Sequence, residues 1–461
     1  MEVKRSVQSC EKAGKMVAAG KREGLVTVAK AVAVSSESRI VTVAKNKGFV
    51  EQVTRENVIY VVKWGYDLGG AAVTLPKGCT LEFRGGTLSN GTLVGRDSEI
   101  VATNRRIFKG VAVKGTWRCI GNALWWAEAS RLSAGTMNEN DDEGAVWRIQ
   151  ERADCSADLQ LALDSAFREM VFPPVAYYIG ETLVLRKEKR LTFEGSTMCL
   201  SLAECQPNIN GAAVVFTDKD ITLLRVAVKE GANWNQASVA IDGGNFDVSL
   251  CQHYTQNCIE VRTDGGEKVW GLTINTAVKA ANPPADNPYV LPAADGTAIN
   301  INPVENKAMA GNKAFVTGVR INALVTNFGT GIRATNYFTD EPGGVYANWC
   351  TDIRIDGIIK NCLRAIDTNV EDADIRATIQ AGGYFGRQDN GRALIRYTGG
   401  FRAAVSSPIY DIGQNLGKWS NQYAVEVTRE EATVTAYGCF RSFIKSMERF
   451  GKAVIKGRIY D

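Results

Sequence analysis

Short apolar runs separated by glycine-containing turns are the feature that most constrains this sequence. Between Asp67 and Gly95 the chain reads DLGGAAVTLPKGCTLEFRGGTLSNGTLVG, with a turn every six to eight residues. Apolar and polar residues alternate within the runs, which places alternate side chains on opposite faces of a strand. The stretch is therefore predicted to form short β-strands joined by tight turns.

Two architectures are built from such strands. Asn90-Gly91 is a hairpin signal, and a sandwich of hairpins is the simpler interpretation. In a β-solenoid, three short strands and three turns make one coil, and the next coil stacks on it. The runs here have three to five residues, which is short for a sandwich, so the sequence favours the solenoid.

A repeat in the middle of the chain supports the same fold. GVRINALVTNFGTGIRAT (Gly318–Thr335) and DIRIDGIIKNCLRAIDT (Asp352–Thr368) align at an offset of 34, and a third copy, DIRATI, begins at Asp374. A repeat of about 22 residues with loop insertions is typical of stacked coils. Asn327 and Asn361 fall at equivalent turns, where their amides are expected to stack between coils.

The clearest helix of the chain is predicted over SADLQLALDSAFREM, Ser156 to Met170. Its apolar stripe consists of Leu159, Leu163, Phe167 and Met170, at helical spacing. Ser156 or Asp158 is expected to cap its first turn.

This region carries a resemblance to a known family. Asp154-Cys155-Ser156-Ala157-Asp158, then LQLALDSA, VFPP, Tyr178-Ile179-Gly180, TLVL and LTFEG, resembles the start of the pectate-lyase-like superfamily. LPKGCTLEFRGGTLSNGTLVG is similar to an N-terminal region of β-helix proteins of gut Bacteroidetes and the phages that infect them. The chain lacks the usual Gly-Asp-Gly before the acidic turn, and Val175-Ala176 replace Gly-Thr. The resemblance implies a right-handed parallel β-helix, and no catalytic motif of the family carries over.

We therefore predict an all-β chain, a right-handed parallel β-helix (β-solenoid) with a capping α-helix and a small N-terminal attachment segment. The predicted divisions are an attachment or oligomerisation segment (1–56), a short-strand β cap (57–120), a linker and capping helix (121–170), the β-helix (171–415) and C-terminal strands or cap (416–461). Within 1–56, LVTVAK recurs as IVTVAK fifteen residues later, and two such strands need a partner to bury a core. An ordinary N-terminal hairpin is the alternative.

Charge, cysteine and histidine content exclude several classes of function. The net charge is +4, but residues 1–50 and the last twenty residues are basic, which suits docking on an acidic partner or a merely solvated tail. Eleven cysteines show no metal-ligand spacing, so free thiols in a reducing cytosol are expected. The only histidine is His253, which argues against histidine-based nucleophilic or metal chemistry. GxGxxG, P-loop and HExxH patterns are absent, which argues against nucleotide-dependent and zinc-protease functions. We predict no metal, no cofactor, no nucleic-acid partner, no signal peptide and no membrane span.

Candidate binding residues come from the repeats. Arg320, Arg354 and Arg376 are predicted to lie on one outward face, and with the loop aromatics Tyr346 and Trp349 they suggest a groove for host surface polysaccharide. The alternative is a solvated face with ordinary surface ion pairs.

Candidate catalytic residues are Asp356, Asp367 and Glu371. Two carboxylates about 5–10 Å apart can hydrolyse a glycoside, whereas a polysaccharide lyase needs a base such as Arg354 or Arg376. An acidic turn between coils is the alternative.

Three functions remain open. The first is a phage virion protein, a tail spike or tail fibre, made in the host cytoplasm and binding host surface glycan. The second is a polysaccharide-degrading enzyme, either a glycoside hydrolase or a polysaccharide lyase. The third is a structural tail or head-fibre subunit. Because spikes of this fold are usually trimers, a homotrimer that docks on other tail proteins through its N-terminal segment is expected.

Overall fold

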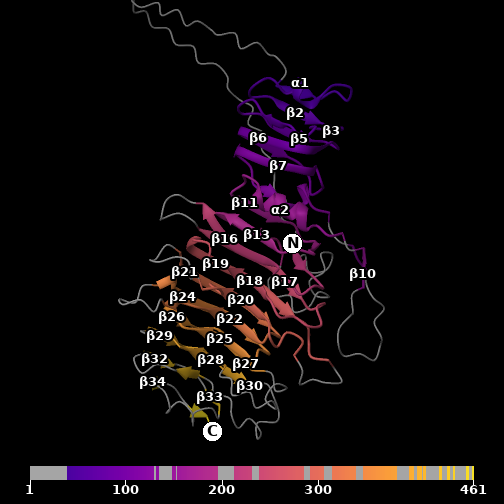
Figure 1. Cartoon of the computed structure of the whole chain (residues 1–461). Coiled ribbons are helices and arrows are strands. Elements are labelled where there is room, and N and C mark those ends of the chain that lie inside the picture. Colours follow the sequence, from indigo (N-terminus) through magenta and orange to yellow (C-terminus); the bar gives the residue numbers. More distant parts are fainter. Residues whose placement is uncertain are drawn as a thin grey trace, which may run out of the picture. The chain divides into compact units, whose positions relative to one another are not determined.

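The fold is described from a computed structural model (Figure 1). The structure describes residues 39–128, 131–133, 148–151, 153–195, 212–230, 238–284, 291–305, 314–338, 346–381, 394–398, 402–407, 409–411, 425–427, 433–436, 440–441, 453–455 and 459–460. The chain divides into two units, Met1–Arg39 and Ile40–Asp461, and every element named below lies in the second.

The first part of this unit is a stack of parallel coils. Its elements are β1 (Ile40–Thr42), α1 (Phe49–Gln52), β2 (Ile59–Val62), β3 (Gly65–Asp67), β4 (Ala72–Thr74), β5 (Thr80–Phe83), β6 (Thr87–Val101) and β7 (Phe108–Trp117). All strand pairs among them are parallel. Strand β1 pairs with β2, so residues 40–56 of the predicted attachment segment pack on the coils that follow, and the division falls after Arg39.

The hairpin alternative for residues 67–95 is wrong. Ser89-Asn90-Gly91 is not a reversal but a bend inside the single strand β6, where Asn90 takes a positive φ of 52°. A Cβ on Gly91 would lie 2.7 Å from the Leu68 side chain, so the previous coil leaves room only for glycine there. The dipeptide therefore makes a corner of the solenoid, a role with the same need for left-handed backbone as a hairpin turn.

The link between the two parts of the unit is a short helical region. It contains β8 (Gly121–Asn122), the 3-10 turn η1 (Ala123–Trp125), the antiparallel pair β9 (Arg131–Ser133) and β10 (Arg148–Glu151), and α2 (Ser156–Asp164). Phe167, just after α2, packs against Trp117, Trp125 and Trp126 with ring centroids 5.7–6.2 Å apart. This aromatic cluster joins the core of the first coils to that of the following ones.

Helix α2 is shorter than predicted, and its cap differs. It ends at Asp164, and the Ser165 hydroxyl donates to Ala162 O at 2.6 Å. Met170 belongs instead to strand β11 (Glu169–Phe172). Its side chain is nevertheless buried, as its place in the predicted apolar stripe led us to expect. At the other end Asp154 Oδ1 accepts from the Ser156 backbone N–H at 2.9 Å, so neither Ser156 nor Asp158 is the cap.

The main body is a parallel β-helix, which confirms the predicted fold class (Figure 1). Its larger sheet contains, besides β8 and β11, β12 (Ala176–Tyr178), β14 (Lys189–Phe193), β15 (Val214–Phe216), β17 (Val239–Val248), β19 (Lys268–Ala280), β21 (Phe315–Thr326), β23 (Tyr337–Phe338), β24 (Tyr346–Lys360), β26 (Glu371–Ile375), β27 (Thr378–Ala381), β29 (Arg402–Val405), β30 (Ile409–Asp411), β32 (Thr433–Ala436) and β34 (Ala453–Ile455). The second sheet contains β13 (Leu183–Lys187), β16 (Leu224–Glu230), β18 (Asn257–Val261), β20 (Thr297–Ile301), β22 (Thr330–Ala334), β25 (Arg364–Thr368), β28 (Ile395–Tyr397) and β31 (Val425–Val427).

The predicted repeat is confirmed for its first two copies and wrong for the third. Ile321 lies opposite Ile355, and the Asn361 amide donates to Asn327 Oδ1 at 3.2 Å, which is the expected asparagine ladder at a corner. Arg354, however, lies opposite Asp374, so DIRATI is shifted by two residues from the predicted register. Side chains in a strand alternate between its two faces, so a shift of two residues leaves the apolar side chains facing the core.

A row of branched aliphatic residues forms the centre of the core. Leu191, Ile241, Ile274, Ile321, Ile355 and Ile375 are opposite one another on successive strands of the larger sheet and are almost fully buried. Burying each such side chain contributes about 1.5–3 kcal/mol. The chain between neighbours in this row varies: 34 residues separate Ile321 from Ile355, but only 20 separate Ile355 from Ile375.

Parallel coils continue beyond residue 415, the predicted end of the β-helix. Strand β31 pairs with β28, and β32 pairs with both β29 and β34. A last parallel pair joins β33 (Phe440–Arg441) to β35 (Ile459–Tyr460). The seven cysteines that the structure describes are all free, as predicted. Within the described residues, no helix has the length and apolar character needed to cross a membrane.

Candidate functional site

A cluster of four basic residues around one glutamate marks a corner of the β-helix. Arg186-Lys187-Glu188-Lys189-Arg190 connects the end of β13 in one sheet to the start of β14 in the other. Four of its side chains are exposed, whereas Lys189 is 2% exposed and points inward. A buried lysine requires acceptors for its ammonium group.

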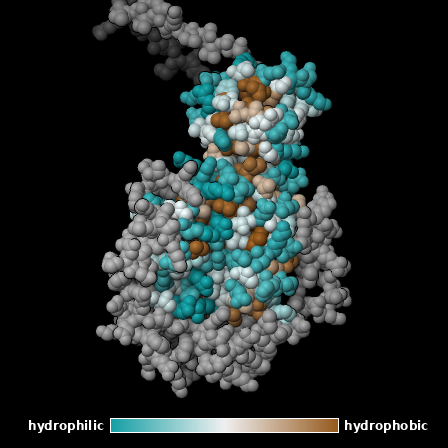
Figure 2. Space-filling model, in the orientation of Figure 1, coloured by the Kyte–Doolittle hydropathy of each residue, from teal (hydrophilic) through white to brown (hydrophobic). Residues whose placement is uncertain are grey.

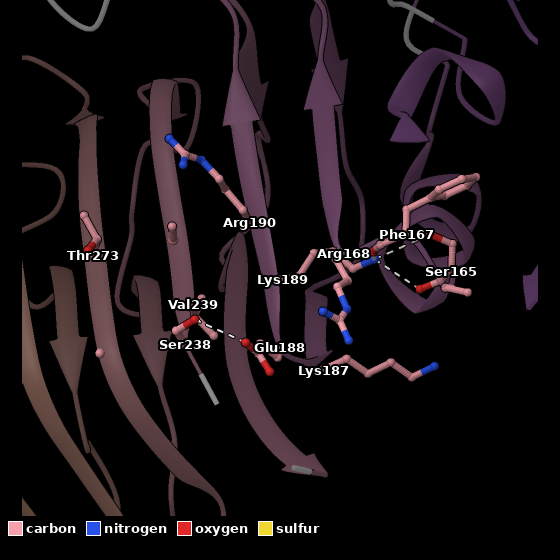
Figure 3. A pocket seen from close by; sticks show the side chains of 13 residues that line it. Ser165, Phe167, Arg168, Lys187, Glu188, Lys189, Arg190, Ser238, Val239 and Thr273 are labelled. Atoms are coloured by element: carbon pink, nitrogen blue, oxygen red, sulfur yellow. Dashed lines mark hydrogen bonds between the residues drawn. The ribbon is translucent and has the colours of Figure 1, made fainter. Parts of the chain in front are cut away.

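Those acceptors come from the end of helix α2. Lys189 Nζ donates to Ser165 O at 3.1 Å, to Ser165 Oγ at 3.5 Å and to Phe167 O (Figure 3). Three acceptors match the three protons of an ammonium group, and carbonyls at a helix C-terminus favour a cation. Burial, together with the positive charge of Lys187 and against the opposing effect of Asp164, lowers the pKa of Lys189 to about 8. The lysine thus fixes the turn after α2.

This turn forms one wall of a cleft of about 560 Å³ (Figure 3). The cleft is lined by residues 165–168, 187–190 and 238–240, with Gly271 and Thr273. It extends from the start of β11 across β14 and β17 to β19, which is three strand spacings, or about 14 Å. The cleft is therefore long enough for an extended ligand.

The lining of the cleft is strongly basic. Arg168, Lys187, Lys189 and Arg190 face a single acidic residue, Glu188. Arg190 is ion-paired with Asp242 at 2.9 Å, and Lys189 is satisfied by the α2 turn. The exposed Arg168 guanidinium and Lys187 ammonium make no ion pair with a described residue, although Lys187 donates to Asp164 O at 3.3 Å. These two cations are available to an anion.

An exposed aromatic ring lies next in sequence to the cleft. Trp270 is 50% exposed and precedes Gly271 of the lining, with its ring 6.0 Å from Phe315 in an edge-on arrangement. Large apolar side chains are otherwise scattered over a mostly hydrophilic surface (Figure 2). A partly exposed tryptophan offers an apolar face to a sugar ring while keeping its N–H for a polar group.

The three arginines predicted to bind glycan do not form one row. Arg320 lies opposite Arg354, as predicted, but the next position of that row is Asp374. The Arg376 backbone N–H donates to Ile355 O, which places Arg376 beside Asp356 in the adjacent row. Arg376 therefore keeps an outward position, as predicted, but it is displaced by two residues from the row of Arg320 and Arg354, the same shift that affects the third repeat.

Each of these arginines is paired with a carboxylate. Arg320 contacts Asp352 at 3.1 Å, Arg354 contacts Asp356 at 2.7 Å, and Arg376 contacts Asp374 at 2.6 Å. The arrangement agrees with the alternative interpretation, a face of surface ion pairs. Trp349 lies opposite Phe315 and is half-buried; Tyr346 begins β24, and its side chain lies outside the described residues. Glycan binding by these five residues stays a prediction.

Asp367 is the centre of an arginine cluster. Its side chain is 7% exposed and contacts Arg396 at 2.7 Å, Arg333 at 3.3 Å and Arg364 at 3.5 Å. Burial raises the pKa of this carboxyl, but the hydrogen bond from Arg396 and the three positive charges outweigh burial and hold the pKa below its usual value. An ionised carboxylate enclosed in this way suits a structural role better than an acid or base.

The structure does not bring the three candidate catalytic carboxylates together. Asp356 and Glu371 lie on neighbouring strands of the larger sheet, but Glu371 is opposite Thr351, five positions from Asp356, or about 16 Å along the strand. Asp367 is on the other sheet. Glycosidase pairs lie about 5–10 Å apart, so Asp356 and Glu371 do not form such a pair, and Asp367 is held by three arginines; the three assignments stay predictions.

The sequence contained one indication of the cleft, a basic cluster that falls within the pattern of short strands. Four basic residues within five positions, Arg186 to Arg190, are unusual at the corner of a coil, where the ladder places like charges close together. Arg168 carries no such signal, because its place in the cleft depends on where α2 ends.

The described residues contain no group of three or more histidine, cysteine, aspartate or glutamate side chains placed to hold a metal. The available chemistry of the site is therefore that of its cations, hydroxyls and nearby aromatic ring. Comparisons of the chain with protein-family models, with curated proteins and with solved structures give no match.

Proposed function

We propose that this chain binds an acidic carbohydrate in the basic cleft, and that it does so as a phage virion protein, a tail spike or tail fibre that attaches to host surface glycan. The observation that carries the binding proposal is the pair Arg168 and Lys187, two cations without a carboxylate partner among the described residues, at a cleft of about 560 Å³. Arginine recognises carboxylate and sulfate groups through two parallel N–H donors, and lysine adds a point charge.

The remaining lining suits a sugar better than an apolar ligand. Ser165, Ser238 and Thr273 carry hydroxyl groups, and Ser238 donates to Glu188 Oε1 at 3.2 Å (Figure 3). Small-molecule pockets are lined mostly by apolar residues, whereas eight of the thirteen residues that line this cleft are polar or charged, and the cleft runs across several strands. The exposed ring of Trp270, adjacent to Gly271, adds a surface on which a sugar can stack.

The virion part of the proposal rests on the fold and on the resemblance of the sequence to β-helical proteins of phages. A parallel β-helix is a rigid body whose side presents a long surface, and the unit Met1–Arg39 divides from it as an attachment segment would. Other tail proteins are the proposed partners of that segment. No observation favours catalysis as a second function, since Asp356 and Glu371 lie apart and Asp367 is neutralised by arginines.

Binding is tested by titrating the full-length protein with polygalacturonate and with an uncharged glucan of matched length in a calorimeter. We expect the polyuronate to bind at least tenfold more tightly at low salt and to lose this advantage as salt rises. The double variant Arg168→Gln, Lys187→Gln should lose about tenfold in affinity, whereas Lys77→Gln, an exposed lysine on the first coils, should lose none.

Equal affinity for both polymers, or an unaffected double variant, would contradict binding at the cleft. The virion part is tested separately by mass spectrometry of purified particles from the phage that encodes the chain. Absence of the protein from the particles would refute that part and leave carbohydrate binding standing.

A further inference from the structure

A second depression of about 780 Å³ lies on the other side of the charged corner. It is lined by Lys114, Asp164, Val184, Arg186, Lys187, Arg225, Ala227, Arg262, Asp264, Gly265 and Glu267. These residues come from β7, the end of α2, β13, β16 and the segment after β18. Lys187 lines both this depression and the basic cleft, so the two meet at that residue.

Most cations of the second depression are already neutralised. Arg186 contacts Asp164 at 3.3 Å, and Arg225 and Arg262 are ion-paired with Glu260 and Asp264. Lys187 and Lys114 are the exceptions: Lys114 is exposed on β7 and, like Lys187, makes no ion pair with a described residue. The joined surface thus carries three cations without a described carboxylate partner, Arg168, Lys187 and Lys114.

These three cations belong to three different elements that converge at the corner. Arg168 follows α2, Lys187 ends β13 and Lys114 lies on β7. Uncompensated like charges on one surface repel one another, and a polyanion that contacts all three removes this repulsion. We propose that the basic cleft and the second depression form one binding surface for an extended acidic polysaccharide, whose successive anionic groups are bound by Arg168, Lys187 and Lys114.

This inference rests on the proposed function and specifies its ligand. The cleft covers about 14 Å along the stack of coils, and the second depression covers two strand spacings, about 10 Å, in the same direction on the other sheet, from β13 across β16 to the segment after β18. A single acidic sugar fills only part of the cleft of about 14 Å, so a chain of sugars is needed to occupy the whole surface. The ligand is therefore a polymer with anionic groups at regular intervals.

A nucleic acid is the other polyanion that such a surface could attract. Proteins that bind single strands stack the bases on exposed aromatic side chains. The lining has no exposed aromatic side chain, since Phe167 is 2% exposed, and Trp270 beside the cleft offers one ring rather than the series on which successive bases stack. The lining therefore favours a polysaccharide, whose charges lie along the chain and whose rings need hydroxyl partners.

The test measures affinity against ligand length. The full-length protein is titrated with oligogalacturonates of increasing length, which carry one carboxylate on every sugar, and with single-stranded oligodeoxythymidylate of equal charge. We expect affinity to rise with length until the chain covers both depressions and then to level off. Lys114→Gln should weaken binding of the longest oligomers about fivefold without affecting the disaccharide, whereas Arg168→Gln should weaken both; Lys77→Gln is the control.

Two results would overturn the inference while leaving the proposed function intact: affinity that does not depend on length, or long oligomers that bind Lys114→Gln as tightly as the unaltered protein. Tighter binding of the oligodeoxythymidylate than of the longest oligogalacturonate would overturn the polysaccharide as ligand. Failure of every oligogalacturonate to bind would refute the proposed function itself.

Discussion

At the scale of single residues, Lys189 links the fold to the cleft. Its ammonium satisfies the oxygens that follow helix α2 and also adds a positive charge behind the lining formed by Arg168 and Lys187. Because burial lowers its pKa to about 8, this charge is partly lost in mildly alkaline solution. Affinity and stability should then respond to pH in opposite directions.

We expect the affinity for a polyuronate to fall about three- to tenfold between pH 7 and pH 9, as Lys189 loses its proton. The free energy of unfolding should rise by roughly 1 kcal/mol over the same range, because the unfolded lysine stays protonated to a pKa near 10.5 and so binds more protons than the folded one. Calorimetric titration and urea unfolding at pH 7, 8 and 9 measure the two changes.

The Lys189→Met variant is the control for this prediction, because it keeps the length of the side chain and removes the titrating group. Both pH dependences should disappear in this variant, while Lys77→Met should keep both. An affinity that falls equally with pH in Lys189→Met would show that another group is responsible.

Residue-scale sites were the least predictable part of the molecule. The acidic residues around Asp367 are visible in the sequence, but the arginines that neutralise it come from three positions, Arg333, Arg364 and Arg396, on successive strands. Their convergence depends on the register between coils, and inserted loops hide this register. A pattern of spacing along the chain does not contain that information.

At the scale of elements, the corners of the coils decide which residues stack. Gly357 in β24 has a φ of 99°, and a Cβ there would lie 2.3 Å from Ala323 O of the preceding coil. Asn327 and Asn361 make the next corner with positive φ and a shared amide hydrogen bond. The sequence predicted the asparagine corner from the repeat, but it did not reveal the two-residue shift at Asp374, since an even shift preserves the apolar pattern.

The corner at Gly357 gives a prediction for stability. Gly357→Ala should lower the free energy of unfolding by about 3 kcal/mol, because it combines left-handed backbone strain with a contact against the neighbouring coil. Gly110→Ala, which has a φ of 62° but no atom within 4 Å of the added Cβ, should cost about 1 kcal/mol. Urea unfolding of the two variants separates strain from contact, and equal losses would contradict the close approach of the coils.

At the scale of the whole molecule, the fold class was predictable because the sequence repeats the same strand-and-corner pattern many times. Alternating short strands, glycine corners and the 34-residue offset all require parallel stacking, and the parallel pairs from β1 to β35 follow that expectation. The basic cleft was not predicted because it forms where α2, the β13–β14 corner and two further coils meet. A repeat describes what the coils share, whereas the cleft depends on helix α2, which interrupts them.

The predicted homotrimer belongs to this scale. Light scattering of the full-length protein should give three times the chain mass of 50.0 kDa. A variant that begins at Ile40 should keep the β-helix by circular dichroism, because the parallel coils begin there. If the variant stays trimeric, the first 39 residues serve attachment rather than assembly; a monomeric full-length protein would contradict the trimer.

The unequal chain lengths between neighbouring isoleucines have a practical consequence. Ile321, Ile355 and Ile375 occupy one continuous row although 34 residues lie in the first interval and 20 in the second. The pairing register of each strand sets the position of its isoleucine in the row, and the length of the chain between strands contributes little to that position. The core position of each strand is therefore independent of the length of the loop that precedes it. Foreign peptides or new recognition loops can then be inserted between coils without redesigning the core.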